Sequence, residues 1–331
     1  MKITFFGIQP YDKESFDRIN KQYGLDIIYH RSQLNCKNVP LAQGSDIVCI
    51  FVNDIADAST IEGLAKSGVK LIALRCAGFN NVDLDAARKF NIKVVRVPAY
   101  SPHAVAEYAI ALMLSLNRKI HRAYWRTRDA NFALHGLLGF DMYDKTIGII
   151  GTGKIAKVLI HILKGFGMKI IAYDLYPDQS FAAKEQISYV TLEELYHQSD
   201  IISLHCPLTD QTRYMIDKHS IELMKPGVMI INTGRGQLIN TEALIEGLKN
   251  KEIGSAGLDV YEEEADYFYK DTSDKILNDD ILARLLSFNN VILTSHQAFF
   301  TREALDNIAL TSLQNIQAFI EHKELINEVK A

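Results

Sequence analysis

A glycine-rich turn, Gly151-Thr-Gly-Lys-Ile-Ala156, stands in the middle of the chain and limits its fold to a narrow class. The turn follows the apolar run 146–150 and opens a segment with apolar residues at helical spacing. A second apolar run, 169–173, then ends in the acid Asp174. Strand, glycine turn, helix, strand and acid is the order of the dinucleotide-binding fingerprint. In that fingerprint the glycines let the backbone approach a pyrophosphate, and the acid accepts a hydrogen bond from a ribose hydroxyl.

The rest of the pattern predicts two α/β units, because short apolar runs alternate with amphipathic segments twice along the chain. The first series ends before residue 100, and the glycine turn belongs to the second. We therefore predict two Rossmann-like doubly wound parallel-sheet domains. A discontinuous, flavodoxin-like substrate domain comprises residues 1–100 and 299–331, and an inserted nucleotide-binding domain comprises residues 101–298.

Each series has its own set of expected elements. The first series predicts strands at 2–8, 26–29, 46–52, 70–76 and 92–97 and helices at 12–23, 58–66 and 84–90. The second predicts six strands, at 146–150, 169–173, 201–206, 228–232, 255–260 and 290–294. A helix from 103 to about 118 is apolar nearly all round, so we expect it to be buried between domains or subunits. A last helix, from 302 to about 322, is expected to return to the first domain, and the acidic, aromatic stretch 262–280 to be a surface insertion.

Bulk properties exclude several classes of partner. The 331 residues carry 36 basic and 40 acidic side chains, a net charge of −4, which gives no reason to expect nucleic acid or an anionic membrane. The first eight residues are too short an apolar run for a signal sequence. The four cysteines are scattered without metal-ligand spacing, so we expect no metal, reduced thiols and a cytoplasmic location.

Polar clusters follow three strands of the second series. They are Asn232-Thr-Gly-Arg-Gly236, Asp259-Val-Tyr-Glu-Glu-Glu264 and Thr294-Ser-His-Gln297. In a dinucleotide fold, ligands bind at the carboxyl ends of the strands, so an arginine, carboxylates and a histidine are expected to converge there.

That combination suits reduction of a keto acid by hydride transfer. Histidine is the natural general acid for the developing alkoxide, a carboxylate fixes the tautomer of its ring, and arginine grips a substrate carboxylate at two points. Two alternatives stay open, because His296 could be a satisfied strand-end histidine and Arg235 a structural loop arginine. The spacing does not decide which of Glu262, Glu263 and Glu264 faces the site.

The chain resembles the D-specific 2-hydroxyacid dehydrogenase family over essentially its full length, and within it the fermentative NAD-dependent D-lactate dehydrogenases. The matching stretches are Arg75-Cys-Ala-Gly-Phe-Asn-Asn-Val-Asp83, Val97-Pro-Ala-Tyr-Ser-Pro102, His121-Arg-Ala-Tyr124, Arg128-Asp-Ala-Asn-Phe132, Gly151–Ile155, Ser203-Leu-His-Cys-Pro-Leu208, Asn232–Gly236, Leu258-Asp-Val-Tyr-Glu262 and Ser295-His-Gln-Ala-Phe299.

The resemblance implies catalytic roles for three residues. Arg235 would bind the substrate carboxylate and carbonyl, His296 would donate the proton, and Glu264 would be the partner of His296.

Two positions depart from the usual pattern. Ala156 replaces the third glycine of the turn, which the fingerprint permits. The small residue that the family has before the arginine is a glycine here, Gly234, which predicts a looser loop.

The resemblance also implies binding roles. Asp174, with no arginine in 175–177 to receive a 2′-phosphate, favours NAD over NADP. The residues expected to bind the coenzyme are Gly151, Gly153, Lys154, Ile155, Asp174, Cys206, Pro207, Thr212, Thr233, Gly234, Arg235 and Asp259. The residues expected to bind substrate are Arg75, Cys76, Ala77, Gly78, Tyr100, Arg235, His296 and Phe299.

The expected activity is reversible hydride transfer between NADH and pyruvate to give D-lactate. Another 2-keto acid, such as hydroxypyruvate or a branched-chain or aromatic one, remains the alternative. An NAD-sensing interaction protein resembling transcriptional corepressors is a remote one. The implied partners are a small-molecule acid and a second copy of the chain, in a homodimer or homotetramer formed through the helix that follows residue 101.

Overall fold

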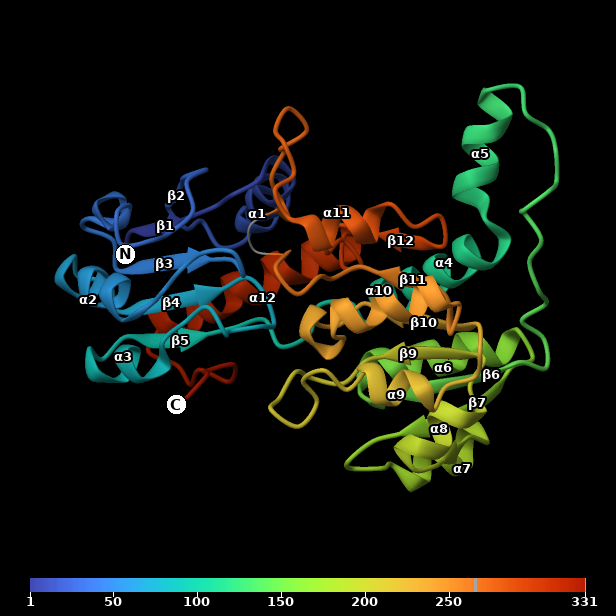
Figure 1. The fold of residues 1–331 in the computed structure, drawn as a ribbon. Coiled ribbons are helices and arrows are strands. Elements are labelled where there is room, and N and C mark those ends of the chain that lie inside the picture. Colours follow the sequence, from blue (N-terminus) through green and yellow to red (C-terminus); the bar gives the residue numbers. More distant parts are fainter. Residues whose placement is uncertain (265–266, 331) are drawn as a thin grey trace. The chain divides into compact units, whose positions relative to one another are not determined.

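The computed structural model describes residues 1–264 and 267–330 and divides the chain into two compact units. The first unit consists of Met1–Ser101 and Phe300–Ala331, and the second of Pro102–Phe299. The predicted fold class is confirmed, since each unit is built on a parallel sheet. Figure 1 labels the helices and strands of both units.

The first unit contains, within the described residues, a five-stranded parallel sheet of order β2-β1-β3-β4-β5. Its elements are β1 (Ile3–Phe5), α1 (Pro10–Asn20), β2 (Ile27–Tyr29), the 3₁₀ helix η1 (Val39–Ala42), β3 (Ile47–Ile50), α2 (Ala58–Lys66), β4 (Leu71–Leu74), α3 (Leu84–Lys89), β5 (Lys93–Val95) and α12 (Arg302–Ile320).

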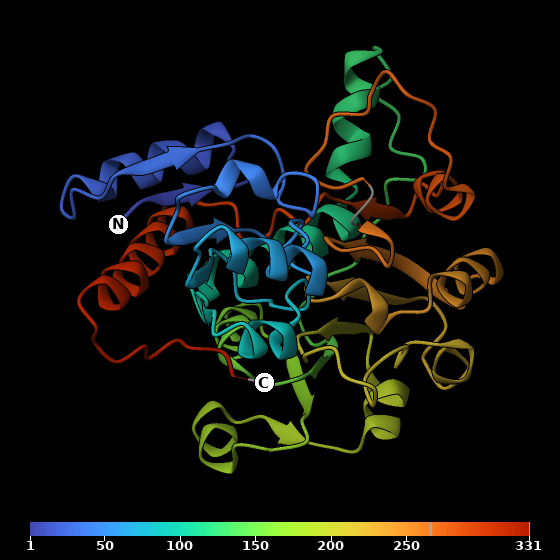
Figure 2. The same cartoon turned by 90° about the vertical axis from the view of Figure 1, so that its left-hand side faces the viewer.

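Successive side chains of each strand in the first unit point to opposite faces of the sheet, and both faces are apolar. Val48 and Ile50 of β3 belong to a buried cluster with Ile61 and Leu64 of α2. The opposite face is covered by α1 and α12, which pack on each other, and α12 also packs on β4. Figure 2 shows α12, in red, beside α1. The last helix of the chain therefore completes the first unit.

The second unit contains a seven-stranded parallel sheet across its described residues, in the order β12-β11-β10-β9-β6-β7-β8. Its elements are α4 (Pro102–Arg118), α5 (Ile120–Arg128), β6 (Thr146–Ile150), α6 (Lys154–Gly165), β7 (Lys169–Tyr173), α7 (Gln179–Glu185), β8 (Ser188–Tyr189), α8 (Leu192–Gln198), β9 (Ile201–Leu204), α9 (Lys218–Glu222), β10 (Val228–Asn232), the 3₁₀ helix η2 (Gly236–Leu238), α10 (Thr241–Asn250), β11 (Ile253–Leu258), α11 (Asp280–Leu286) and β12 (Val291–Leu293).

Helices cover both faces of this sheet. Ile147 and Ile149 of β6 share one buried cluster with Leu112 of α4 and Leu159 of α6. Ile150, one residue later, belongs to the opposite cluster with side chains of α8, α9, α10 and α11. The chain order reverses between β6 and β9, so the glycine turn after β6 lies at the switch point of a doubly wound sheet.

The structure changes two expectations for the second unit. The sheet has a seventh strand, β8, whose two residues are too few to show a periodic pattern. The stretch 262–280, of which 265–266 lie outside the described residues, is a surface segment only in part. Residues 270–280 are mostly exposed, but Phe268 is buried in the core and Tyr267 and Tyr269 pack against it. Helix α4 packs on α6, β10 and β11 of its own unit, and its expected place between subunits stays a prediction.

Over the described residues, none of the helices combines the length and apolar character needed to cross a membrane.

Candidate active site

The glycine turn leaves room only for glycine at its first position. Gly151 has φ 88°, in the left-handed region, and a β-carbon there would lie 2.6 Å from the backbone nitrogen of Cys206. Cys206 follows β9, the strand that pairs with β6 at the switch point. The backbones of the two strand ends are therefore in close contact where a doubly wound sheet binds its ligand.

The start of α6 fits a dinucleotide. Gly153 is its N-cap and has no side-chain cap bond within the described chain, so the N–H groups of its first turn, around Lys154 and Ile155, are not capped by a side chain. A β-carbon at Gly153 would have nothing within 4 Å, which leaves space for a phosphate group. The Thr233 hydroxyl, in a side chain only 8% exposed, also has no hydrogen-bond partner among the described residues.

Asp174, directly after β7, is held by the glycine turn itself. Its Oδ2 accepts hydrogen bonds from the Thr152 N–H at 2.6 Å and the Thr152 hydroxyl at 2.8 Å, and its Oδ1 accepts from the Tyr176 N–H at 2.9 Å. Burial by itself would raise the pKa of Asp174, but these three donors lower it below its ordinary value. The acid is therefore ionised near neutral pH and is fixed beside the turn.

The residues after β9 form a short structured turn. The Thr212 hydroxyl donates to the Pro207 carbonyl at 2.7 Å, which ties the two predicted coenzyme residues together. Burial raises the pKa of the Cys206 thiol to about 11, so this cysteine is a neutral thiol and not a nucleophile.

The loop after β10 carries Arg235. Asn232, which is buried, holds this loop by accepting from the Gly234 N–H at 3.0 Å and donating to the Arg235 carbonyl at 2.9 Å. The looseness expected from Gly234 is therefore offset by two hydrogen bonds. The Arg235 side chain is partly exposed, and its Nη1 donates to the Gly234 carbonyl at 2.8 Å.

His296 and Glu264 are in direct contact. The Nδ1 atom of His296 and the Oε1 atom of Glu264 are 2.9 Å apart, and the two side chains are 19% and 27% exposed. A carboxylate only accepts hydrogen bonds, so the imidazole Nδ1 carries the proton and Nε2 is left for another partner. Glu262 instead accepts from the Thr241 N–H at 2.8 Å, which distinguishes it from Glu264.

Asp259 holds the loop that bears His296. The side chain is fully buried, and it accepts from the Thr294 hydroxyl at 2.6 Å and from the N–H groups of Gln297 at 2.9 Å and Ala298 at 2.7 Å. Its backbone carbonyl accepts from the His296 N–H at 2.8 Å. Asp259 therefore anchors this loop, and its contact with the coenzyme stays a prediction.

Sequence reasoning missed one residue at this loop, Tyr269. Its hydroxyl donates to the His296 carbonyl at 3.1 Å, and His296 has φ 54°, a left-handed conformation that is unusual for histidine. Nothing in the sequence distinguishes Tyr269 from the other tyrosines of this stretch.

In the first unit, the stretch that begins at Arg75 follows β4. Arg75 cannot contact a substrate as predicted, because its side chain is 1% exposed and donates to the Gly7 carbonyl at 3.0 Å, with Asp12 3.7 Å away. Cys76 is also buried, whereas Ala77 and Gly78 are partly exposed. The Tyr100 carbonyl accepts from Asn307 at 2.7 Å.

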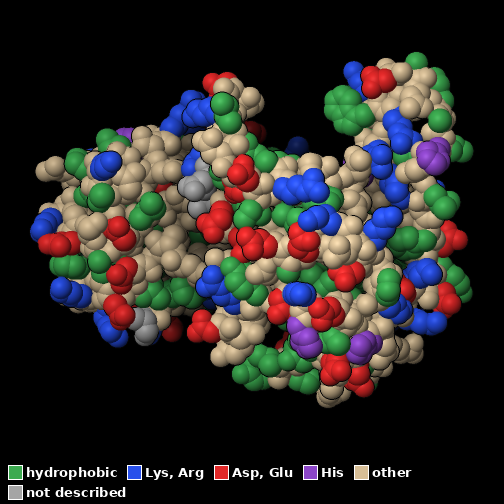
Figure 3. Space-filling view, viewed as in Figure 1, with side chains coloured by type: hydrophobic (Ala, Val, Ile, Leu, Met, Phe, Trp, Pro, Cys, Tyr) green, Lys and Arg blue, Asp and Glu red, His purple; other side chains and the backbone are tan. Residues whose placement is uncertain are grey.

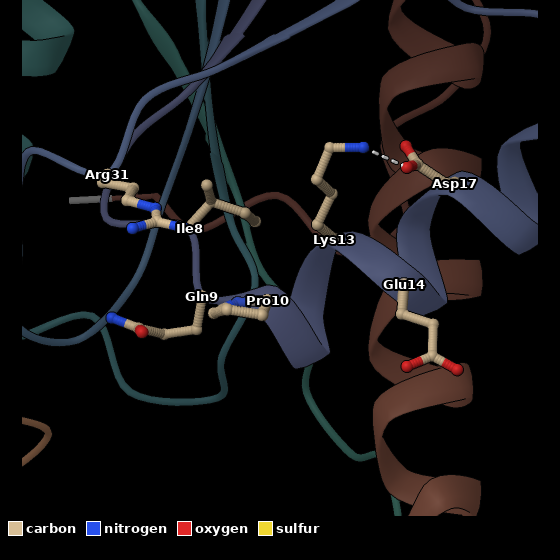
Figure 4. Close-up of a pocket in the computed structure, with 7 residues that line it drawn as sticks. All are labelled: Ile8, Gln9, Pro10, Lys13, Glu14, Asp17 and Arg31. Carbon is tan, nitrogen blue, oxygen red and sulfur yellow. Dashed lines mark hydrogen bonds and ion pairs between the residues drawn. The ribbon is translucent and has the colours of Figure 1, made fainter.

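A separate surface cavity of the first unit, of about 310 Å³, lies at the start of α1. Figure 4 shows that Lys13 and Asp17 on its wall form an ion pair, and none of the predicted site residues lines it. Phe299, which is also a predicted substrate residue, is the last residue of the second unit in the sequence, and its side chain is buried.

A glycine turn at a switch point, an ionised acid beside it and a histidine–carboxylate pair at the same edge of the sheet define a dinucleotide-binding protein. The family described as D-isomer specific 2-hydroxyacid dehydrogenase, NAD binding domain, matches residues 110–298. The chain is 51% identical to the D-lactate dehydrogenase of Escherichia coli (strain K12) over 329 residues, 99% of this chain and 100% of that protein.

Solved structures agree with this match. The apo-structure of D-lactate dehydrogenase from Escherichia coli has a TM-score of 0.91 at 49% identity, covering 99% of this chain and 100% of that one. The pyruvate reductase of Chlamydomonas reinhardtii has a TM-score of 0.94 at 44% identity, covering 99% and 98%. The chain belongs to the family of D-isomer specific 2-hydroxyacid dehydrogenases, and its second unit contains the NAD-binding domain.

Proposed function

We propose that this chain is an NAD-dependent D-lactate dehydrogenase that reduces pyruvate to D-lactate. The observation that carries the proposal is the 2.9 Å contact between His296 and Glu264, which presents one imidazole nitrogen for proton transfer. The 51% identity to the D-lactate dehydrogenase of Escherichia coli, over 99% of this chain, supports pyruvate as the substrate.

In the proposed reaction, His296 and Arg235 act on the substrate, and Glu264 acts on His296. Bound NADH supplies a hydride to the carbonyl carbon. His296 acts as the protonated imidazolium, with Nδ1–H directed at Glu264. It delivers the proton from Nε2 to the carbonyl oxygen and is left as the neutral imidazole, so that the ketone becomes an alcohol. Glu264 fixes the ring tautomer through Nδ1, and Arg235 binds the carboxylate and polarises the carbonyl. The reverse reaction uses the same groups, with Nε2 as the base.

We also propose a division of labour between the two units. The second unit holds the coenzyme and the three catalytic residues. The first unit is the substrate domain, where backbone N–H groups of Cys76, Ala77 and Gly78, with Tyr100, bind the substrate carboxylate. Phe299 would contribute an apolar contact.

The kinetic test of this assignment compares three 2-keto acids. We expect kcat/KM with NADH to be highest for pyruvate and lower for phenylpyruvate and hydroxypyruvate. A higher value for either of the larger acids would replace pyruvate as the substrate while leaving the family reaction in place.

Asp174 is proposed to select NAD by accepting a hydrogen bond from the 2′-hydroxyl of the adenosine ribose and repelling a 2′-phosphate. Asp174→Ala is expected to lower the ratio of kcat/KM with NADH to that with NADPH by about 10- to 100-fold, the effect of losing a charged hydrogen-bond acceptor. The exposed Asp274 provides the control, since Asp274→Ala should leave the ratio unchanged. Equal ratios in the wild type and Asp174→Ala would show that another residue selects the coenzyme.

We propose that the expected homodimer or homotetramer associates through α5 and the segment after it, in addition to α4. No residue of α5 is buried within the described chain, and large apolar side chains are exposed from α5 to residue 143. Figure 3 shows apolar and basic side chains together over this part of the molecule. A patch of this kind marks an association site. The exposed side chains are Ile120, Tyr124, Trp125, Phe132, Leu134, Leu138, Phe140 and Tyr143.

Trp125→Glu is expected to convert the oligomer to monomers, because it replaces a large apolar side chain of the interface with a charged one that must be desolvated. Light scattering coupled to size exclusion measures the molar mass. Ile276→Glu, at a side chain 86% exposed outside this patch, is the control and should keep the wild-type mass. An unchanged mass for Trp125→Glu would exclude α5 from the interface.

We also propose a cytoplasmic location, because the four cysteines are free.

A further inference from the structure

The short strand β8 brings a tyrosine to the glycine turn. β8 pairs with β7 at the edge of the sheet, with Tyr189 opposite Ala172. The hydroxyl of Tyr189 lies 2.9 Å from the Thr152 hydroxyl, although 37 residues separate them in the sequence. Thr152, whose side chain is 5% exposed, occupies the variable position between the two glycines of the turn.

Hydrogen bonds connect these two hydroxyls to the acid after β7 in one direction. The Asp178 N–H donates to the Tyr189 oxygen at 3.1 Å, and the Tyr189 hydroxyl donates to the Thr152 oxygen at 2.9 Å. The Thr152 hydroxyl donates to Oδ2 of Asp174 at 2.8 Å. Since a carboxylate accepts only, every donor in this series of hydrogen bonds is directed toward Asp174, and each hydrogen bond polarises the next.

The starting point of this chain is itself fixed. Asp178 caps α7 by accepting from the Phe181 N–H at 3.0 Å, and its Oδ2 pairs with Lys157 of α6 at 2.5 Å. Lys157 also lies over the Phe181 ring at 4.8 Å. The backbone N–H that begins the chain is therefore held in place by two helices.

The same bonds leave Asp174 in one orientation. Oδ2 faces the turn, where it accepts two hydrogen bonds from Thr152, and Oδ1 accepts one from the Tyr176 N–H. A carboxylate has about four lone-pair sites, so capacity remains for one further donor. Because Thr152 occupies one oxygen, rotation of the carboxylate would break hydrogen bonds in the turn.

We propose that Tyr189 and Thr152 are positioning residues, which hold Asp174 in the orientation that recognises the 2′-hydroxyl of the adenosine ribose. This inference rests on the proposed role of Asp174 and extends it to a residue outside the glycine turn. Recognition of the ribose then depends on β8, and not only on the glycine turn and its acid.

The test measures dissociation constants of NADH, and of its analogue without the adenosine 2′-hydroxyl, by titration of ligand fluorescence. Tyr189→Phe and Thr152→Val each remove one hydroxyl from the chain. Each is expected to weaken NADH binding about three- to tenfold, the effect of losing one hydrogen bond, and to leave the affinity for the 2′-deoxy analogue unchanged. The preference for NADH over the analogue falls by the same factor.

Matched variants separate positioning from damage to the fold. Thr152→Ser keeps a hydroxyl and should restore the wild-type preference, and Tyr23→Phe changes a partly exposed tyrosine of the first unit and should have no effect. The melting temperature of each variant is measured alongside.

Two results would overturn the proposal. If Tyr189→Phe and Thr152→Val weaken both ligands equally, or neither, the two hydroxyls do not position the acid. Asp174→Ala is titrated in parallel, so that failure of the positioning role can be told apart from failure of the proposed role of Asp174. A preference unchanged in Asp174→Ala would remove Asp174 from ribose recognition, and the positioning role with it. A preference lost in Asp174→Ala but retained in the other two variants would overturn the positioning role alone.

Discussion

Replacing His296 with glutamine is expected to lower kcat for pyruvate reduction by about 10²–10⁴-fold, the range for loss of a general acid. The imidazole Nδ1 lies 2.9 Å from Glu264, so Nε2 is the nitrogen available to protonate the substrate. Glutamine keeps a polar side chain of similar length but offers no group that titrates near neutral pH. NADH affinity, measured by fluorescence titration, should stay close to the wild-type value.

His322 supplies a matched control for this substitution. It is exposed, and it has the same left-handed φ of 54° as His296. His322→Gln therefore carries the same backbone strain without touching the proposed site, and its kcat should be unchanged. If His296→Gln kept wild-type turnover while remaining folded, His296 would be a structural strand-end histidine and the catalytic assignment would be wrong.

Gly236→Ala is expected to lower kcat/KM by about 100-fold or more. A β-carbon at Gly236 would lie 2.1 Å from the carbonyl carbon and oxygen of Tyr261 and 2.6 Å from the nitrogen of Glu262. No backbone accepts such contacts, so the Arg235 loop and the segment leading to Glu264 must separate by about 1 Å. A displacement of that size costs about 100-fold in rate when it misplaces catalytic groups.

Gly165→Ala, at the end of α6, is the control. A β-carbon there would meet no atom within 4 Å, so alanine fits without displacement. We expect kcat/KM within about twofold of the wild type, as for substitutions that disturb no packing, and an unchanged or slightly raised melting temperature. Equal activity in the two variants would contradict the close approach of the β10 and β11 loops.

Long, strongly patterned segments made the fold predictable. Strand β6, the glycine turn and α6 carry their structure locally, since an apolar run, an obligatory glycine and a helical apolar stripe follow one another. β8 was missed because two residues have no period, and its place is set only by pairing with β7. The same reason hid Tyr189, whose partner Thr152 is remote in sequence.

Site residues were predictable by type and position, but not by the direction of their side chains. Arg235, Asp259 and His296 were predicted as site residues because each follows a strand, and the carboxyl ends of parallel strands lie at one edge of a sheet. Asp259 nevertheless is fully buried and accepts from three donors of its own unit, and the Arg75 side chain is also buried. Such choices depend on tertiary hydrogen bonds, which a local pattern does not encode.

The most direct test of the proposed activity follows NADH oxidation by the purified protein with pyruvate and then determines the configuration of the lactate formed. We predict rapid NADH oxidation, a strong preference over NADPH, and D-lactate as the product. Formation of L-lactate, or no oxidation of NADH by a folded protein that binds it, would show that the protein is not a D-lactate dehydrogenase.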